Sequence, residues 1–155
     1  MRWIGIDPGN KGGIAILEQD DSVEVYPMPI TGTGKDKLID AATVAEIIGG
    51  RDGLVVIEKV HAMPKQGVSS TFAFGRGFGQ LIGVLQVMGL QWAMVTPQAW
   101  KKAILAGCGD KGKKATIAWC KRMFPDVSLI PERCRTEHDG MVDALAMAEY
   151  GRRMR

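Results

Sequence analysis

The segment GLVVIEKV at residues 53–60 constrains the fold more than any other part of the sequence. It is an almost unbroken apolar run, which is typical of a central strand that is buried on both faces. Such a strand needs helices on both sides of its sheet. Segments with helical spacing or helix-start signals lie at 38–50, 71–89, 97–106, 113–124 and 138–153. The chain is therefore predicted to be of the α/β class, with Ser69 or Ser70 capping the second of these helices.

Four more segments have the pattern of strands. They are RWIGID (2–7), GIAILE (13–18), SVEVYPM (22–28) and QWAMVTP (91–97). The first two, joined by the turn PGNKGG, predict a β-hairpin, and the third continues it as an antiparallel strand. Residues 31–37 predict a flexible loop. Three meandering strands followed by alternating helices and strands predict a mixed sheet in one domain, residues 1–155, rather than an all-parallel dinucleotide-binding fold.

Composition excludes several classes of protein. No run of 18 or more apolar residues occurs, so no membrane span is expected. The N-terminus shows no basic stretch followed by an apolar leader, which predicts a cytoplasmic protein. The three cysteines are odd in number and form no C-x-x-C pair, so we expect reduced thiols rather than disulfides or zinc ligands.

Charge is distributed unevenly along the chain, although the net charge is only +3. Residues 1–60 are net acidic, whereas residues 96–123 carry seven lysines and arginines against the single acid Asp110. A basic block beside an acidic region suits a polyanionic partner. The alternative is an ordinary solvated helix face.

Four carboxylates occupy unusual positions. Asp7 and Glu58 each end a predicted strand, where acids are poor strand residues. Asp139 and Asp143 are spaced i and i+4, which puts them on one helix face. Clustered carboxylates repel, and a divalent cation such as Mg²⁺ or Mn²⁺ removes that cost. Two such ions about 3.5–4 Å apart can activate a water and stabilise the leaving oxygen of a phosphodiester.

Each acid also has a purely structural interpretation. Asp7 could cap the DPGN turn, Glu58 could pair with Lys59, and Asp139 could cap the last helix. The placement of all these acids at strand ends and on one helix face favours the metal site.

Three segments resemble a known family. IGIDPG (4–9), VVIEKV (55–60) and HDGMVDALAMAEY (138–150) are similar to the RuvC-type Holliday junction resolvases, notably their phage-borne members, in the RNase H-like nuclease superfamily. The resemblance covers nearly the whole chain. It implies an RNase H-like fold with a five-stranded mixed sheet, in which three antiparallel strands are continued by two parallel ones, flanked by helices.

The resemblance also implies an activity. Members nick two symmetric strands of a four-way DNA junction as homodimers, using Mg²⁺ or Mn²⁺, with two ions expected per active site. This implies a crossover junction endodeoxyribonuclease of a bacterial or phage-infected cytoplasm, without a membrane association or a nucleotide cofactor.

Site residues follow from the same resemblance. Asp7, Glu58 and Asp143 match the family's metal-binding carboxylates. The family's remaining C-terminal ligand falls on Gly140, so we take the neighbouring Asp139 as the fourth ligand. His138 is the other candidate, as an auxiliary ligand or a general base.

The basic block resembles the lysine-bearing segment of the family. This puts Lys102 and Lys113 nearest the scissile phosphate, with Lys113 in a catalytic role. The expected contacts to the DNA backbone are Lys101, Lys102, Lys111, Lys113 and Lys114. The family's base-stacking aromatic falls on His61, which either stacks on a base or is a loop histidine bonded to backbone. Arg76 either contacts the DNA backbone or is solvated.

Other functions remain as alternatives. The nearest are an RNase H-like nuclease that acts on RNA–DNA hybrid, ribosomal RNA precursor or branched DNA, and a non-catalytic junction-binding protein. The segment GCGDKGKK (107–114) departs from a nucleotide-binding phosphate loop at Lys114, where a hydroxyl is required. An ATPase of the actin or sugar-kinase type would need a duplicated domain, for which the chain is too short.

Overall fold

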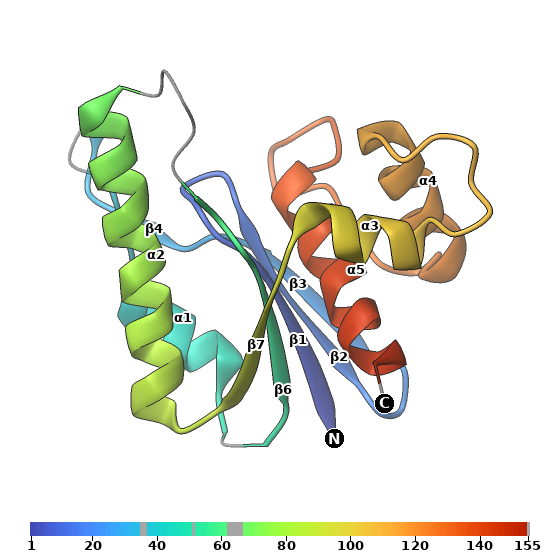
Figure 1. Cartoon of the computed structure of the whole chain (residues 1–155), viewed down its shortest axis with the longest axis horizontal. Helices are drawn as coiled ribbons and strands as arrows, with labels where there is room; N and C mark the ends of the chain where they lie inside the picture. The colour runs from blue at the N-terminus through green and yellow to red at the C-terminus, as the bar shows by residue number, and fades with distance from the viewer. Residues whose placement is uncertain (35–36, 51, 62–66, 155) are drawn as a thin grey trace.

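The structure is a computed structural model that describes residues 1–34, 37–50, 52–61 and 67–154. Its centre is a five-stranded sheet with the strand order β3-β2-β1-β6-β7 (Figure 1). The strands are β1 (Arg2–Asp7), β2 (Gly13–Glu18), β3 (Val23–Pro27), β6 (Leu54–Glu58) and β7 (Gln91–Val95). The first three pair antiparallel, and β6 and β7 continue the sheet in parallel with β1. The predicted fold class is confirmed.

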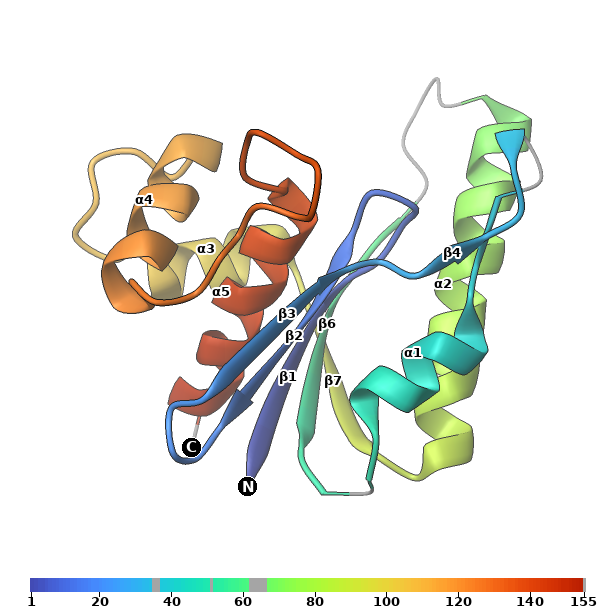
Figure 2. The ribbon, with the colours of Figure 1, turned by 180° about the vertical axis from the view of Figure 1, so that it is seen from behind.

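Helices cover both faces of this sheet. They are α1 (Ala41–Ile48), α2 (Val68–Met88), α3 (Pro97–Ile104), α4 (Lys113–Met123) and α5 (Asp139–Arg153). Helices α1 and α2 lie on one side, and α3, α4 and α5 lie on the other, as the view from behind also shows (Figure 2). No helix in the described parts of the chain is long and apolar enough to cross a membrane.

Successive side chains of each strand point to opposite faces of the sheet, so the strands contribute to two separate hydrophobic cores. Ile4 and Ile6 of β1 pack toward α1 and α2, whereas Trp3 packs toward α3, α4 and α5. In β6, Val55 and Ile57 join the first core, and Val56 joins the second. The continuous apolar run of β6 therefore reflects burial on both faces, as the sequence predicts.

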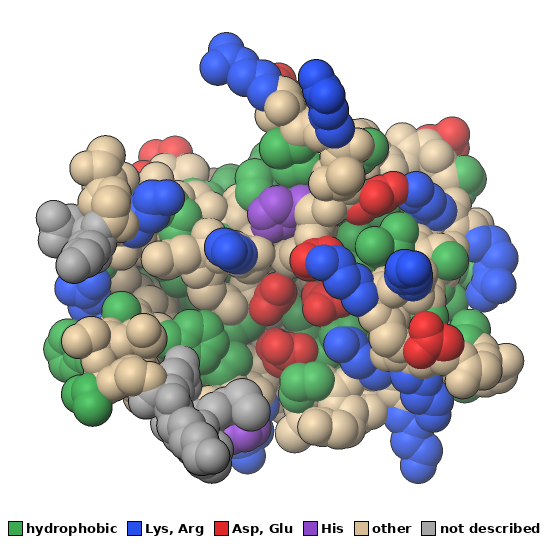
Figure 3. All heavy atoms as spheres, turned by 90° about the horizontal axis from the view of Figure 1, so that it is seen from above, with side chains coloured by type: hydrophobic (Ala, Val, Ile, Leu, Met, Phe, Trp, Pro, Cys, Tyr) green, Lys and Arg blue, Asp and Glu red, His purple; other side chains and the backbone are tan. Residues whose placement is uncertain are grey.

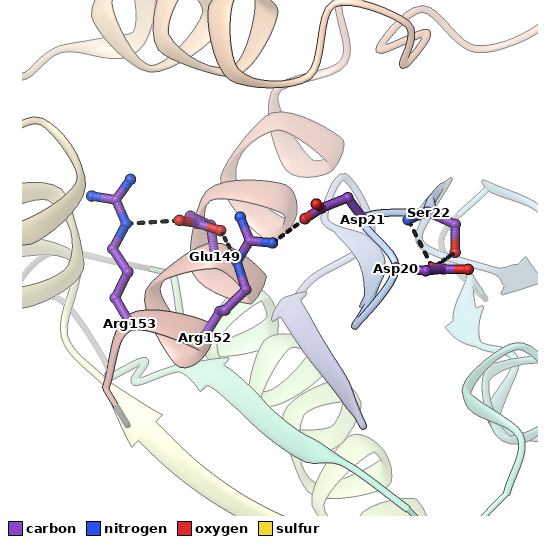
Figure 4. Close-up of polar contacts among 6 residues, drawn as sticks. All are labelled: Asp20, Asp21, Ser22, Glu149, Arg152 and Arg153. Carbon is purple, nitrogen blue, oxygen red and sulfur yellow. Dashed lines mark hydrogen bonds and ion pairs between the residues drawn. The ribbon is translucent and has the colours of Figure 1, made fainter.

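Helix α5 is held against the sheet at its two ends in different ways. Near its N-terminus, glycines permit close contact: a Cβ on Gly140 would lie 2.3 Å from the backbone carbon of Gly12. Near its C-terminus, Glu149 is almost fully buried and pairs with the Nε atoms of Arg152 at 2.6 Å and Arg153 at 2.7 Å. Arg152 also pairs with Asp21 in the β2–β3 turn (Figure 4). These contacts fix how α5 crosses the sheet.

The structure differs from the predicted elements in two places. Residues 30–31 and 38–39 form a small two-stranded sheet, β4 (Ile30–Thr31) with β5 (Leu38–Ile39), where a loop and a helix start were predicted. Helix α1 begins later, at Ala41, because the Asp40 side chain accepts from the Thr43 backbone N–H. Helix α2 begins at Val68 after Gly67, without a side-chain cap from Ser69 or Ser70.

The three cysteines are free, as predicted.

Candidate active site

Two of the predicted acids stand at one end of the sheet because β1 and β6 are parallel neighbours. Ile6 pairs with Ile57, so Asp7 and Glu58 are the next residues along each strand. Alternation puts Asp7 on the face of Trp3, and Glu58 on the face of Val56. Both carboxylates therefore belong to the sheet face that α5 covers.

Helix α5 brings the other two acids to this same end. His138 caps the helix, with its Nδ1 accepting from the Met141 backbone N–H at 3.3 Å. Asp139 is the first helical residue and is half exposed, and Asp143 lies one turn further and is partly buried. Acidic side chains gather in the middle of this end of the molecule, between the two helical layers, as the view from above shows (Figure 3).

The acids influence one another strongly. Burial, followed by the charges of Glu58 and Asp143, raises the pKa of Asp7 to about 8. Burial also raises the pKa of Asp143 to about 6, with Glu58 and Asp139 adding to the effect. An anion that is desolvated among other anions is destabilised in this way. Additional positive charge at this place would therefore stabilise the ionised carboxylates.

Two lysines partly offset this repulsion. Lys101 of α3 lowers the pKa of both Asp7 and Asp143, and Lys113 at the start of α4 lowers that of Asp143. Lys113 also forms an ion pair with Asp139. Lys102, which the sequence resemblance predicts near the scissile phosphate, is exposed. It is not among the charges that shift the pKa of Asp7 or of Asp143. The lysines whose charge reaches the acids are thus Lys101 and Lys113.

The structural alternatives for the acids are tested by their contacts. Glu58 accepts a hydrogen bond from the indole of Trp100 and forms no ion pair with Lys59 within the described residues. The helix cap is His138, not Asp139. In the described part of the chain, the Asp7 side chain takes part in no hydrogen bond, so it does not cap the DPGN turn.

Gly140, the position next to Asp139, has no room for a side chain. This residue presses on the backbone of the β1–β2 turn, where Gly12 and Gly13 leave no room for a side chain. An aspartate there would clash with the backbone. Asp139, one position earlier, has a half-exposed side chain.

The donor set suits a hard divalent cation. Carboxylate oxygens from Asp7, Glu58, Asp139 and Asp143 are the ligands that Mg²⁺ and Mn²⁺ prefer, and their mutual repulsion is the cost that such an ion removes. As they stand, no three His, Cys, Asp or Glu side chains among the described residues are close enough to hold an ion. The residues therefore fit the metal in the chemistry of their side chains, and they come to the same end of the sheet.

Several predicted DNA contacts are exposed on the surface. Lys102, Lys111, Lys114 and Arg76 are exposed, the first three on the side of α3 and α4. His61 is exposed and lines a hollow of about 200 Å³ together with Thr71, Phe74 and Phe78. A second hollow of about 320 Å³ is also lined by Phe74, together with Gly9, Asn10 and Ser70.

Sequence analysis missed one residue of this site, Trp100. In the sequence it is an apolar residue of a short amphipathic helix, and nothing marks it as a partner of an acid 42 positions away. The pairing of β6 with β7 is the signal that could have found it, since it sets α3 beside Glu58.

Comparison with known proteins identifies the class of fold. RuvC of Thermus thermophilus is 18% identical and matches with a TM-score of 0.61, over 99% of this chain and 96% of RuvC. RuvC of the same organism in complex with Holliday junction substrate matches over the same shares, at the same identity, with a TM-score of 0.63. No protein-family model and no curated protein sequence matches this chain.

A third structure extends the comparison beyond bacteria. The yeast mitochondrial Holliday junction resolvase Ydc2 is 10% identical and matches with a TM-score of 0.54, over 94% of this chain and 75% of its own. The chain therefore has a RuvC-like, RNase H-like fold, and the resemblance noted in the sequence is confirmed at the level of the fold.

Proposed function

We propose that this protein is a divalent-metal-dependent endonuclease that resolves four-way DNA junctions. The observation that carries the proposal is the meeting of four acids from β1, β6 and α5 at one end of a RuvC-like sheet, with Lys101 and Lys113 beside them. The sequence expectation of a cytoplasmic enzyme without a nucleotide cofactor is part of the same proposal.

Asp7, Glu58, Asp139 and Asp143 would hold the metal, with two ions expected per site and His138 adjacent to them. When bound, Mg²⁺ or Mn²⁺ would supply a nucleophilic water and stabilise the leaving oxygen of the phosphodiester. The chain's own task is to orient these oxygens. The strand ends of β1 and β6 and the packed first turn of α5 would provide the rigid supports for this.

Lys101 and Lys113 hold the phosphate in this proposal. Lys113 is paired with Asp139 in the free protein, and its ammonium is largely exposed, so it can exchange the carboxylate for a phosphate oxygen. A fixed ammonium there also stabilises negative charge that develops on the phosphate. Lys102, Lys111, Lys114 and Arg76 add backbone contacts that weaken with salt.

The unpaired bases at a crossover would lie beside Phe74. The two hollows that Phe74 lines provide space for them, and His61 borders one of these hollows. A base that stacks on the imidazole of His61 would be held more weakly than on a larger aromatic ring.

Two symmetric nicks need two active sites, and α2 offers a surface for a homodimer. Val68, Phe72 and Val87 expose 87%, 71% and 87% of their surface, respectively, which is unusual for such side chains. Gly75, Gly79 and Gly83 have open space where a Cβ would stand. An apolar helix face with small residues suits close packing against a second copy.

A comparison of substrates tests this function. With Mg²⁺ or Mn²⁺, we expect the protein to nick a synthetic four-way junction at symmetric positions and to leave linear duplex of the same sequences intact. Preferred cutting of an RNA–DNA hybrid or a flap would replace the proposal with a different RNase H-like nuclease. Tight junction binding without cutting would indicate a non-catalytic junction-binding protein.

A further inference from the structure

Trp100 connects the second helical layer directly to one of the acids. Its indole Nε1 donates a hydrogen bond to Oε1 of Glu58 at 2.9 Å, and the side chain is completely buried. A buried indole N–H normally requires an acceptor. In the same core, however, the indole nitrogen of Trp3 is buried without one among the residues that the structure describes. Packing alone therefore does not explain why the Trp100 N–H is directed at Glu58.

The local sequence brings Trp100 to this position. Glu58 pairs with Val95 at the end of β7, and Lys59 N–H donates to the Val95 carbonyl at 2.7 Å. The next residue, Thr96, caps α3 through its side chain, and Pro97 begins the helix. Trp100 is one turn into that helix, so it lies back over Glu58.

The same indole also contacts a lysine. The Nζ of Lys101 lies 5.1 Å from the centre of the Trp100 ring, over its face. Such a cation–π contact restrains a long side chain that would otherwise be mobile. Lys101 is the lysine whose charge reaches both Asp7 and Asp143. Trp100 thus contacts an acid through its N–H and a cation through its ring.

We propose that Trp100 is a positioning residue that orients the Glu58 carboxylate for a divalent metal and holds Lys101 beside it. The inference rests on the proposed function, because it assigns Glu58 to the metal. A hydrogen bond that occupies one oxygen of a ligating carboxylate fixes the direction in which the group can bind. A phenylalanine would fill the same core but would lose the hydrogen bond.

The affinity for Mn²⁺, measured from the electron paramagnetic resonance of the free ion, tests this role without reference to activity. We expect Trp100→Phe to weaken Mn²⁺ binding about 10-fold or more, as for other partners of metal ligands. Trp119→Phe is the matched control, because Trp119 is also buried in the same core but contacts Phe124 and Arg153 instead. It should leave the affinity within about twofold of wild type.

A second measurement does not depend on whether Trp100→Phe folds. In the metal-free protein, the indole N–H resonance of Trp100, assigned by its contacts, should shift in the Glu58→Ala variant more than those of Trp3, Trp92 and Trp119. An unmoved resonance would overturn the inference. So would a Trp100→Phe variant that folds and binds Mn²⁺ as tightly as wild type.

The outcomes separate this inference from the proposed function. A wild-type protein that binds Mn²⁺ but cuts no junction would refute the function, whereas the loss of affinity in Trp100→Phe would still support the role of Trp100. A wild-type protein that cuts junctions, with no loss of affinity in the variant, would refute the role of Trp100 alone.

Discussion

An Asp7→Asn variant should cut a four-way junction at least about 1,000-fold more slowly than wild type, a loss of roughly 4 kcal/mol in transition-state stabilisation. Asp7 is close enough to the other three acids to be affected by each of them, because the charges of Glu58, Asp143 and Asp139 all raise its pKa. Asparagine keeps the size of the side chain but removes the charge that attracts the cation. Junction binding should survive, because the basic surface is unchanged.

Single-turnover cleavage and a gel-shift assay without metal measure these two properties separately. Asp126→Asn is a suitable control, since Asp126 is an exposed acid of the α4–α5 connection. Its cleavage rate should match that of wild type. Cleavage by Asp7→Asn at the wild-type rate would show that the site lies elsewhere.

The same variant should be more stable than wild type when no metal is present. The pKa of Asp7 is raised from 3.8 to about 8 in the folded protein, so the fold binds this proton more tightly than the unfolded chain does. The stability of the wild type therefore falls as the pH rises through this range, and Asp7→Asn removes that loss. Thermal unfolding at pH 5 and pH 9 should show a larger advantage for the variant at pH 9.

Gly140→Ala should destabilise the protein by about 3 kcal/mol, or roughly 10 °C in Tm. The added Cβ would lie 2.3 Å from the backbone carbon of Gly12, and backbone cannot move aside as a flexible side chain can. The usual gain in helix propensity from glycine to alanine, about 1 kcal/mol, is too small to compensate. Displacement of the first turn of α5 should also move Asp139 and Asp143 and slow cleavage.

Thermal or denaturant unfolding measures this effect, with Gly109→Ala as the control. Gly109 has open space where a Cβ would stand and no positive φ, so its substitution should change stability by less than about 1 kcal/mol. A Gly140→Ala variant as stable as wild type would mean that α5 does not press on the β1–β2 turn.

Much of this fold could be predicted from the sequence, because its strands carry strong local signals. The apolar run of β6 and the PGNKGG turn indicate buried strands and a hairpin whatever surrounds them. The short strands β4 and β5 were missed because two-residue ladders leave no periodicity to detect. The start of α2 was misplaced because Gly67 begins it without the side-chain cap that marks most helix starts.

The placement of the candidate acids at one end of the sheet was predictable where it depends on strand ends and helix spacing. Asp7, Glu58 and Asp143 follow from those two patterns. The hydrogen bond from Trp100 to Glu58 and the place of Lys101 beside the acids could not be predicted, because they depend on where α3 begins and on how it packs over Glu58. The reason for Gly140 likewise lies in a contact between α5 and a turn far away in the sequence.

The most direct test of the whole account is a titration of the wild-type protein with Mn²⁺ by calorimetry, alongside Asp7→Asn and Asp126→Asn. We predict saturable binding by wild type and Asp126→Asn, and its loss in Asp7→Asn. Absence of saturable binding by the wild type up to millimolar Mn²⁺, with or without a bound junction, would contradict the account, as would equal binding by Asp7→Asn.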